Sequence, residues 1–161
     1  MTRTAVVDAS PLIFLARGGH LAILQSFYAQ VIVPDSVMKE LCERGPADPT
    51  RVALEGAPWI ERRSTESVSV HIAAWGLGAG ESAVLSLAAS LRDAEAILDD
   101  QAARRCAAAC EISVRGTLGM ILLSKRRGMI SAARPVLEDL IAGGMYLSTT
   151  TLDRALRTVG E

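Results

Sequence analysis

Short runs of Val, Ile, Leu and Ala alternate with longer helix-like segments along most of this chain, and this alternation restricts its fold more than any other feature. Each short run is long enough for one buried strand, and a helix-like segment follows each one. Strands that alternate with helices favour a parallel sheet covered by helices on both faces. The predicted strands are residues 4–7, 30–33, 59–60 with their flanks, 96–98 and 112–114. We therefore predict an α/β fold with three layers, α/β/α, around a parallel sheet of about five strands.

Local signals predict the helices. Ser10 followed by Pro11 is typical of a helix start, because serine can cap a helix and proline suits its first turn. From Glu81 onward, apolar residues at 84, 87, 88 and 91 have the i, i+3, i+4, i+7 spacing of a buried helix face. Further helices are predicted at residues 20–28, 34–41, 102–110, 118–125, 132–141 and 148–156. The segment 45–80, which contains three prolines, is predicted to be the least regular part.

The length and charge of the chain limit its class. A chain of 161 residues suits one domain with one core, and we predict a single domain over residues 1–161. The formal net charge is −1, so attraction to a nucleic acid requires a local basic patch. The candidates are Arg104-Arg105 and Lys125-Arg126-Arg127. Three cysteines are too few for a disulfide framework, and no signal peptide or membrane span is apparent, which indicates a soluble cytoplasmic protein.

Acidic residues lie next to apolar segments at four separate places. Asp8 ends the first apolar run and Asp99-Asp100 ends a later one, while Glu40 and Glu81 lie in helix-like segments. In open parallel sheets, ligands bind outside the carboxyl ends of the strands where the strand order reverses, so these carboxylates are able to converge there. Two like charges about 4 Å apart repel by on the order of 4 kcal/mol at an effective dielectric near 20. A converged cluster would therefore take up protons or bind a cation.

The ligand chemistry of such a cluster points to particular ions. All-oxygen ligands favour Mg²⁺ or Mn²⁺ over zinc, which prefers nitrogen and sulfur. His20 and His71 do not have the spacing of a metal-binding pair. One or two such ions can activate water and stabilise the pentacoordinate phosphorus that forms when a phosphodiester is hydrolysed.

Each of these residues also has an ordinary structural interpretation. Asp8 can cap the following helix, and Asp99-Asp100 can be an acid pair favoured by a helix dipole. Glu81 can be a first-turn acid, and Glu40 can belong to a solvated helix face. Thr117 can either cap a helix or donate a hydrogen bond to a site carboxylate or a phosphate.

Several short motifs occur in order along nearly the whole chain. They are Val6-Val7-Asp8-Ala9-Ser10-Pro11-Leu12, Val31-Ile32-Val33-Pro34 followed by Glu40-Leu41, Gly80-Glu81-Ser82-Ala83, Leu98-Asp99-Asp100 with Arg104-Arg105, and Gly116-Thr117-Leu118-Gly119 leading into Lys125-Arg126-Arg127-Gly128. Together they resemble the motifs of PIN-domain ribonucleases, most closely the branch related to VapC-type toxins of bacterial toxin–antitoxin pairs. The resemblance implies a parallel sheet with helices on both sides, an acidic pocket for Mg²⁺ or Mn²⁺, and endonucleolytic cleavage of RNA.

The resemblance also implies roles for individual residues and partners. Carried over by position, the catalytic acids are Asp8, Glu40, Glu81 and Asp99, and the metal ligands are Asp8, Glu81, Asp99 and Asp100. A small antitoxin that covers the acidic crevice and a homodimer are expected as well. The chain departs from the family pattern where Glu81 replaces an aspartate and where Leu98-Asp99-Asp100 replaces Thr-x-Asp. These departures leave open a PIN-like module that binds a partner with little or no catalysis.

Overall fold

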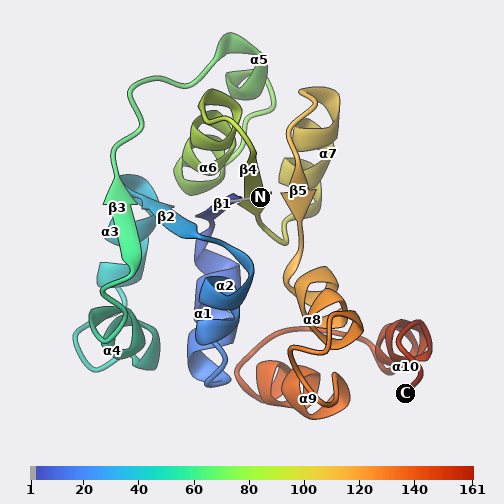
Figure 1. Cartoon of the computed structure of the whole chain (residues 1–161). Helices are drawn as coiled ribbons and strands as arrows, with labels where there is room; N and C mark the ends of the chain where they lie inside the picture. Colours follow the sequence, from blue (N-terminus) through green and yellow to red (C-terminus); the bar gives the residue numbers. More distant parts are fainter. Residues whose placement is uncertain (1–2) are drawn as a thin grey trace.

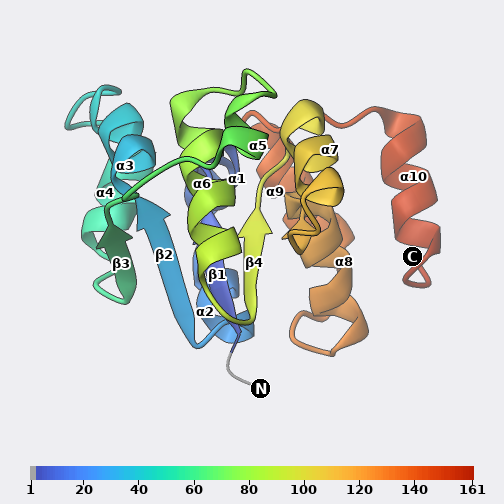
Figure 2. The same cartoon turned by 90° about the horizontal axis from the view of Figure 1, so that it is seen from above.

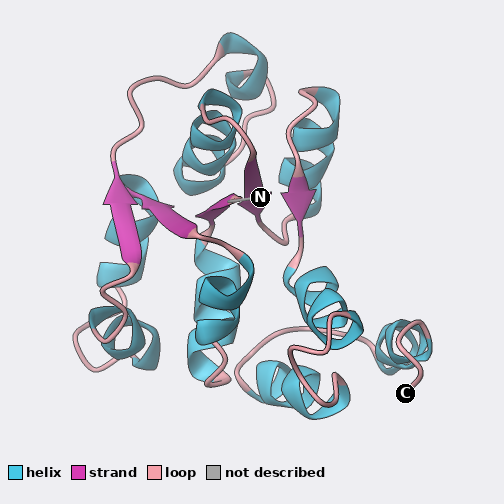
Figure 3. Cartoon of the chain, viewed as in Figure 1, coloured by secondary structure: helices cyan, strands magenta, loops and turns pink. Residues whose placement is uncertain are grey.

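The computed structural model describes residues 3–161 and contains one sheet of five strands. The strands lie in the order β3-β2-β1-β4-β5 (Figures 1 and 3), and every neighbouring pair is parallel, as predicted. Their bounds are β1 Thr4–Val7, β2 Gln30–Pro34, β3 Ile60–Arg63, β4 Ala94–Ile97 and β5 Val114–Arg115.

Helices cover both faces of the sheet and complete the predicted three layers. Their bounds are α1 Ala9–Arg17, α2 Ala22–Phe27, α3 Asp35–Cys42, α4 Pro49–Glu55, α5 Val70–Ala73, α6 Ala79–Ser90, α7 Gln101–Ala109, α8 Thr117–Arg126, α9 Arg134–Ala142 and α10 Thr149–Arg157. Helices α5, α6 and α7 lie on one side of the sheet, and α1, α2, α8 and α9 lie on the other (Figures 1 and 2). Among residues 3–161, no helix has the length and apolar character that a membrane crossing requires.

The central strands are buried on both faces, which explains why they read as continuous apolar runs rather than alternating ones. In β1, Ala5, Val6 and Val7 have no exposed surface, and the same is true of Ala96 and Ile97 in β4. Helix α6 packs across β1, β2 and β4, so the apolar stripe predicted on this helix faces the sheet.

The structure moves several predicted boundaries. Helix α1 begins at Ala9, so Asp8 and not Ser10 occupies its N-cap position. Strand β4 begins and ends earlier than predicted, and β5 begins and ends later, whereas the strand expected at 59–60 extends to Arg63. Helix α4 lies inside the segment expected to be least regular. Asp48 caps α4 by accepting a hydrogen bond from the Thr50 N–H at 2.9 Å, and proline is its first residue.

The strand order reverses between β1 and β4. The chain moves outward from β1 to β2 and β3, and then returns to the other side of β1 to form β4. Asp8 follows β1 directly, and its backbone N–H donates to the carbonyl oxygen of Ile97 at 2.9 Å. Asp99 comes shortly after the end of β4. The fold therefore brings these two acids to the point at which open parallel sheets bind their ligands.

Candidate active site

Asp8 lies between the end of β1 and the first turn of α1, and it is only 6% exposed. It occupies the N-cap position of α1, yet its side chain accepts no capping hydrogen bond. Aspartate is favoured at this position because its carboxylate accepts such a bond from the second or third helical residue. Helix capping therefore does not account for this buried carboxylate.

The surroundings of Asp8 oppose its ionisation. Burial raises the pKa of its carboxyl group from 3.8 to about 7. The backbone N–H of Ala9 lowers this pKa, whereas the negative charges of Glu81, Glu40 and Asp99 raise it further. An ionised carboxylate with little water around it and three like charges nearby is stabilised by a cation. Strongly perturbed groups of this kind cluster at functional sites.

Glu40 approaches Asp8 from helix α3. A Cβ atom on Gly80 would lie 3.4 Å from Oδ1 of Asp8 and 3.5 Å from Oε2 of Glu40, so both oxygens border one small space that the glycine leaves open. Glu40 belongs to the last turn of α3, where the helix dipole disfavours a negative charge. The stability of α3 therefore does not explain a glutamate at this position, whereas a role beside Asp8 does.

Glu81 reaches the site from the first turn of α6. Its Oε2 accepts a hydrogen bond from the backbone N–H of Gly78 at 3.0 Å, so the side chain also caps the helix. The reciprocal half of a capping box is missing because Gly78 has no side chain. Among the acids that raise the pKa of Asp8, Glu81 has the largest influence. Glu81 therefore both caps the start of α6 and belongs to the acidic site.

Asp99 is fixed by the first residue of α8. Its Oδ1 accepts a hydrogen bond from the Thr117 N–H at 2.7 Å, and its Oδ2 accepts one from the Thr117 hydroxyl at 2.6 Å. Thr117 has no exposed surface. Of the two interpretations of Thr117, donation to a site carboxylate is thus the one observed, and the paired bonds fix the orientation of that carboxylate.

Asp100 turns away from this cluster. Its Oδ1 accepts a hydrogen bond from the Ala103 N–H at 2.8 Å, as the N-cap of α7. It is not among the acids that raise the pKa of Asp8. The structure thus brings together four of the predicted acids and separates the fifth from them. Sequence alone could not distinguish Asp99 from Asp100, because both follow the same strand.

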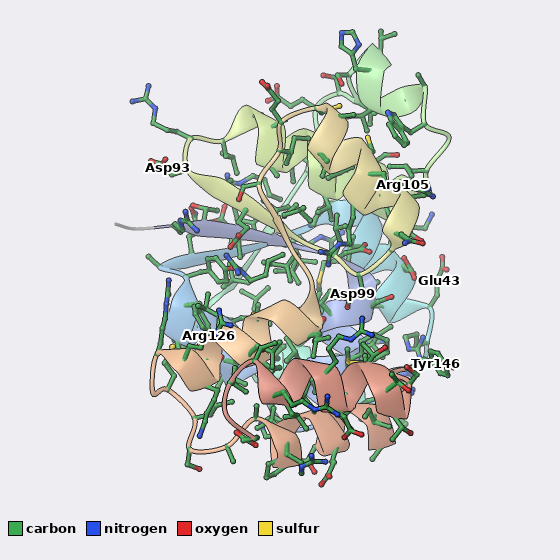
Figure 4. All side chains as sticks on the ribbon, turned by 90° about the vertical axis from the view of Figure 1, so that its right-hand side faces the viewer. Glu43, Asp93, Asp99, Arg105, Arg126 and Tyr146 are labelled. Atoms are coloured by element: carbon green, nitrogen blue, oxygen red, sulfur yellow. The ribbon has the colours of Figure 1, made fainter. Side chains whose placement is uncertain are left out.

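A cleft of about 440 Å³ opens beside Asp8. The start of α1, helix α3 and the start of α6 form its walls, which include Glu40 and Glu81 but not Asp99. Glu43 and Lys39 also line it, although neither was predicted to belong to the site. The position of Glu43 three residues after Glu40 was the available signal, since residues at that spacing share a helix face. Glu43 and Asp99 lie toward the same side of the molecule in Figure 4.

Comparison with known families agrees with this geometry. A family model described as the PIN domain matches residues 4–161. The chain belongs to the PIN domain family. PIN domains are generally metal-dependent nucleases, and their three-layer α/β/α fold is the one observed. No curated protein matches the chain.

The acids of this PIN domain fit a divalent cation by their chemistry. Carboxylate oxygens are the ligands that Mg²⁺ and Mn²⁺ prefer, and the buried Asp8 lacks a compensating positive charge. Within residues 3–161, no three Asp, Glu, His or Cys side chains are close enough to hold an ion as they stand. Mg²⁺ commonly keeps several waters and uses only one or two protein carboxylates. A dense protein cage is therefore not needed for Mg²⁺ to bind here.

The basic run at the end of α8 lies away from the acids of this PIN domain. The Lys125 ammonium is 3.5 Å from the carboxylate of Glu161, and Arg126 donates to the carbonyl oxygen of Thr158 at 3.3 Å. Figure 4 shows Arg126 toward one side of the molecule and Asp99 nearer the centre of the view. These contacts tie α8 to the end of the chain, which supports a structural role for this run.

Proposed function

We propose that this PIN domain is an endoribonuclease that hydrolyses RNA phosphodiester bonds with Mg²⁺ or Mn²⁺ as cofactor. The observation that carries the proposal is Asp8, a buried and uncapped carboxylate whose pKa is raised to about 7 by burial and by three nearby acids. Such an ion, when bound, supplies the missing positive charge, activates water and stabilises the charge that develops on phosphorus.

The surroundings of the four acids suggest a different role for each of them. Asp8 and Asp99 are proposed as principal ligands, because they follow the two strands on either side of the strand-order reversal. Glu81 is a further ligand, since its capping bond uses Oε2 alone. Glu40 is exposed, which suits a ligand or a base that orients the attacking water. We leave Asp100 out of this set because its carboxylate caps α7.

The resemblance to VapC-type proteins supports a biological role as the toxin of a toxin–antitoxin pair. We propose that a small antitoxin covers the acidic cleft, where a cationic side chain would compensate Glu40 and Glu43. We also propose that the protein forms a homodimer, which light scattering after size exclusion would test. Inducible expression would test the toxin role: growth arrest is expected with the native protein and not with Asp8→Asn.

Cleavage of RNA by the purified protein is the direct test of the nuclease proposal. With Mn²⁺ or Mg²⁺, the native protein is expected to cleave single-stranded or structured RNA, and a chelator is expected to stop it. Asp8→Asn and Asp99→Asn should both abolish cleavage, with circular dichroism showing that each variant is folded. Asp100→Asn should retain cleavage. Equal cleavage by the native protein and Asp8→Asn would refute the proposal and indicate a contaminating nuclease.

Two observations favour a second candidate, a partner-binding module with little or no catalysis. Within residues 3–161 no three potential ligands already stand close enough for an ion, and Glu81 departs from the family's aspartate. Calorimetry distinguishes the two candidates. Absence of Mn²⁺ and Mg²⁺ binding, together with intact partner binding, would favour the module.

A further inference from the structure

Arg104, on helix α7, lies beside the carboxylate of Asp99. A Cβ atom on Gly116 would overlap Nη1 of Arg104 and would come within 3.0 Å of Oδ1 of Asp99. The guanidinium and the carboxylate therefore both border this backbone position, and a Cβ atom there would require the guanidinium to move. Gly116 has φ −89° and ψ 163°, an extended conformation open to any residue, so a substitution here would act by displacing the Arg104 side chain and not through backbone strain.

The guanidinium of Arg104 is unpaired in the described part of the chain. No salt bridge or side-chain hydrogen bond joins it to an acceptor among residues 3–161, and both oxygens of Asp99 accept from Thr117 instead. The Arg104 side chain is also exposed. Its Nη1 atom occupies the space where a Cβ atom on Gly116 would lie, and its N–H donors remain available to a ligand. The neighbouring Thr117 anchors the acid next to it.

An acidic cleft by itself repels RNA, because every phosphate carries a negative charge. A positive side chain at the edge of the acids removes part of this repulsion. Lys39 lines the cleft on the α3 side, and Arg104 lies beside Asp99 on the α7 side. A guanidinium suits this task because its planar donors form paired hydrogen bonds with phosphate oxygens.

We propose that Arg104 is a substrate-binding residue that holds an RNA phosphate next to the bond that is cleaved. Because Gly116 has no side chain, it leaves room for the guanidinium near Asp99, so the bound phosphate lies close to this acid. This inference rests on the proposed nuclease function and adds to it a site for the RNA backbone. Because the contact is to phosphate and not to a base, it is expected to act equally on RNAs of different sequence.

RNA binding without cleavage tests this inference directly. The probe is a fluorescent single-stranded RNA, titrated with Asp8→Asn protein in chelator at several salt concentrations. Adding Arg104→Ala should weaken binding about tenfold, as expected for a charge-assisted hydrogen bond. It should also reduce the slope of log affinity against log salt by about 0.7, the contribution of one phosphate contact on a single strand.

Two further variants distinguish the effect of the position of the Arg104 guanidinium from the effect of net charge. Arg92→Ala removes an equal charge from the loop before β4 and is expected to leave RNA affinity within twofold. Gly116→Ala keeps the charge of Arg104 and displaces its guanidinium, so it should reproduce most of the loss. Equal weakening by Arg92→Ala and Arg104→Ala would overturn the inference, because it would reflect net charge alone.

Cleavage kinetics in the native background complete the test. Arg104→Ala should raise KM more than it lowers kcat, and Arg104→Lys should recover part of the loss. The outcomes for the two proposals are distinguishable, because binding is measured apart from cleavage. A native protein that binds RNA through Arg104 without cleaving it would refute the nuclease and retain the phosphate site. A native protein that cleaves RNA while Arg104→Ala binds normally would overturn the phosphate site alone.

Discussion

Replacing Asp8 with asparagine is expected to stabilise the folded protein at neutral pH while it removes a proposed catalytic acid. Asp8 is buried beside three carboxylates, and its pKa is about 7 in the folded protein compared with 3.8 for an ordinary aspartate. Asparagine has nearly the same shape and does not ionise. The variant therefore avoids the unfavourable charge without leaving a cavity in the fold.

The size of the effect follows from the two pKa values of Asp8. Between pH 3.8 and about 7, the folded protein binds one proton that the unfolded chain has released. The free energy of unfolding therefore falls by about 1.4 kcal/mol for each pH unit as the pH rises through this window. Across the whole window the loss reaches up to about 4 kcal/mol. Asp8→Asn should restore that amount at pH 8 and nothing below pH 3.8.

Thermal unfolding in chelator between pH 4 and 8 measures this difference. Each kcal/mol should appear as roughly 2–4 °C in Tm for a chain of this size. Asp100→Asn is the matched control: asparagine caps a helix about as well as aspartate, so this variant should change stability by less than about 0.5 kcal/mol. If the Tm of Asp8→Asn does not exceed that of the native protein at pH 8, the argument from burial and repulsion is wrong.

Three further predictions concern metal binding, the hydrogen bond from Thr117 to Asp99, and a buried ion pair. Because an ion displaces the proton of Asp8, Mn²⁺ affinity measured by calorimetry should rise with pH up to about 7, and an affinity that does not vary with pH would contradict this. Thr117→Val removes the hydroxyl 2.6 Å from Asp99 and should slow cleavage at least tenfold, since such bonds contribute about 1.5–3 kcal/mol; an unchanged kcat/KM would count against it. Arg115→Met removes the donor 2.8 Å from Glu95, which is 3% exposed, and should lower the free energy of unfolding in urea by about 3 kcal/mol.

The sheet and two of its acids could be predicted from the sequence because burial on both faces leaves a continuous apolar run. Asp8 and Asp99 end such runs, and the carboxyl ends of parallel strands share one edge of the sheet. Helices α4 and α5 were not predicted, because seven and four residues are too short to show the apolar spacing used elsewhere. Neither of these helices lines the acidic cleft, so the prediction of the site did not depend on them.

The finer features of the site depend on contacts between residues far apart in the chain. Thr117 distinguishes Asp99 from Asp100, because it donates hydrogen bonds to Asp99 alone. Thr117 lies eighteen positions after Asp99, so this contact is not visible in the local sequence. Lys39 and Glu43 face the cleft because of how α3 is rotated against its neighbours. Periodicity identifies the apolar face of a helix, but it does not say which polar residues beside that face meet another element.

The acids of the candidate site are stabilised to different degrees, and this difference explains why Asp8 dominates the electrostatics of the site. Glu81 accepts a backbone N–H at the start of α6, and Asp99 accepts one at the start of α8. Helix N-termini favour negative charge, so these two carboxylates are compensated within the protein. Asp8 occupies the same kind of position on α1 without a capping bond, and its charge is left for a ligand to compensate. Neutralising Asp99 would therefore weaken its bonds to Thr117 and should not stabilise the protein, in contrast to Asp8→Asn, although both changes should abolish cleavage.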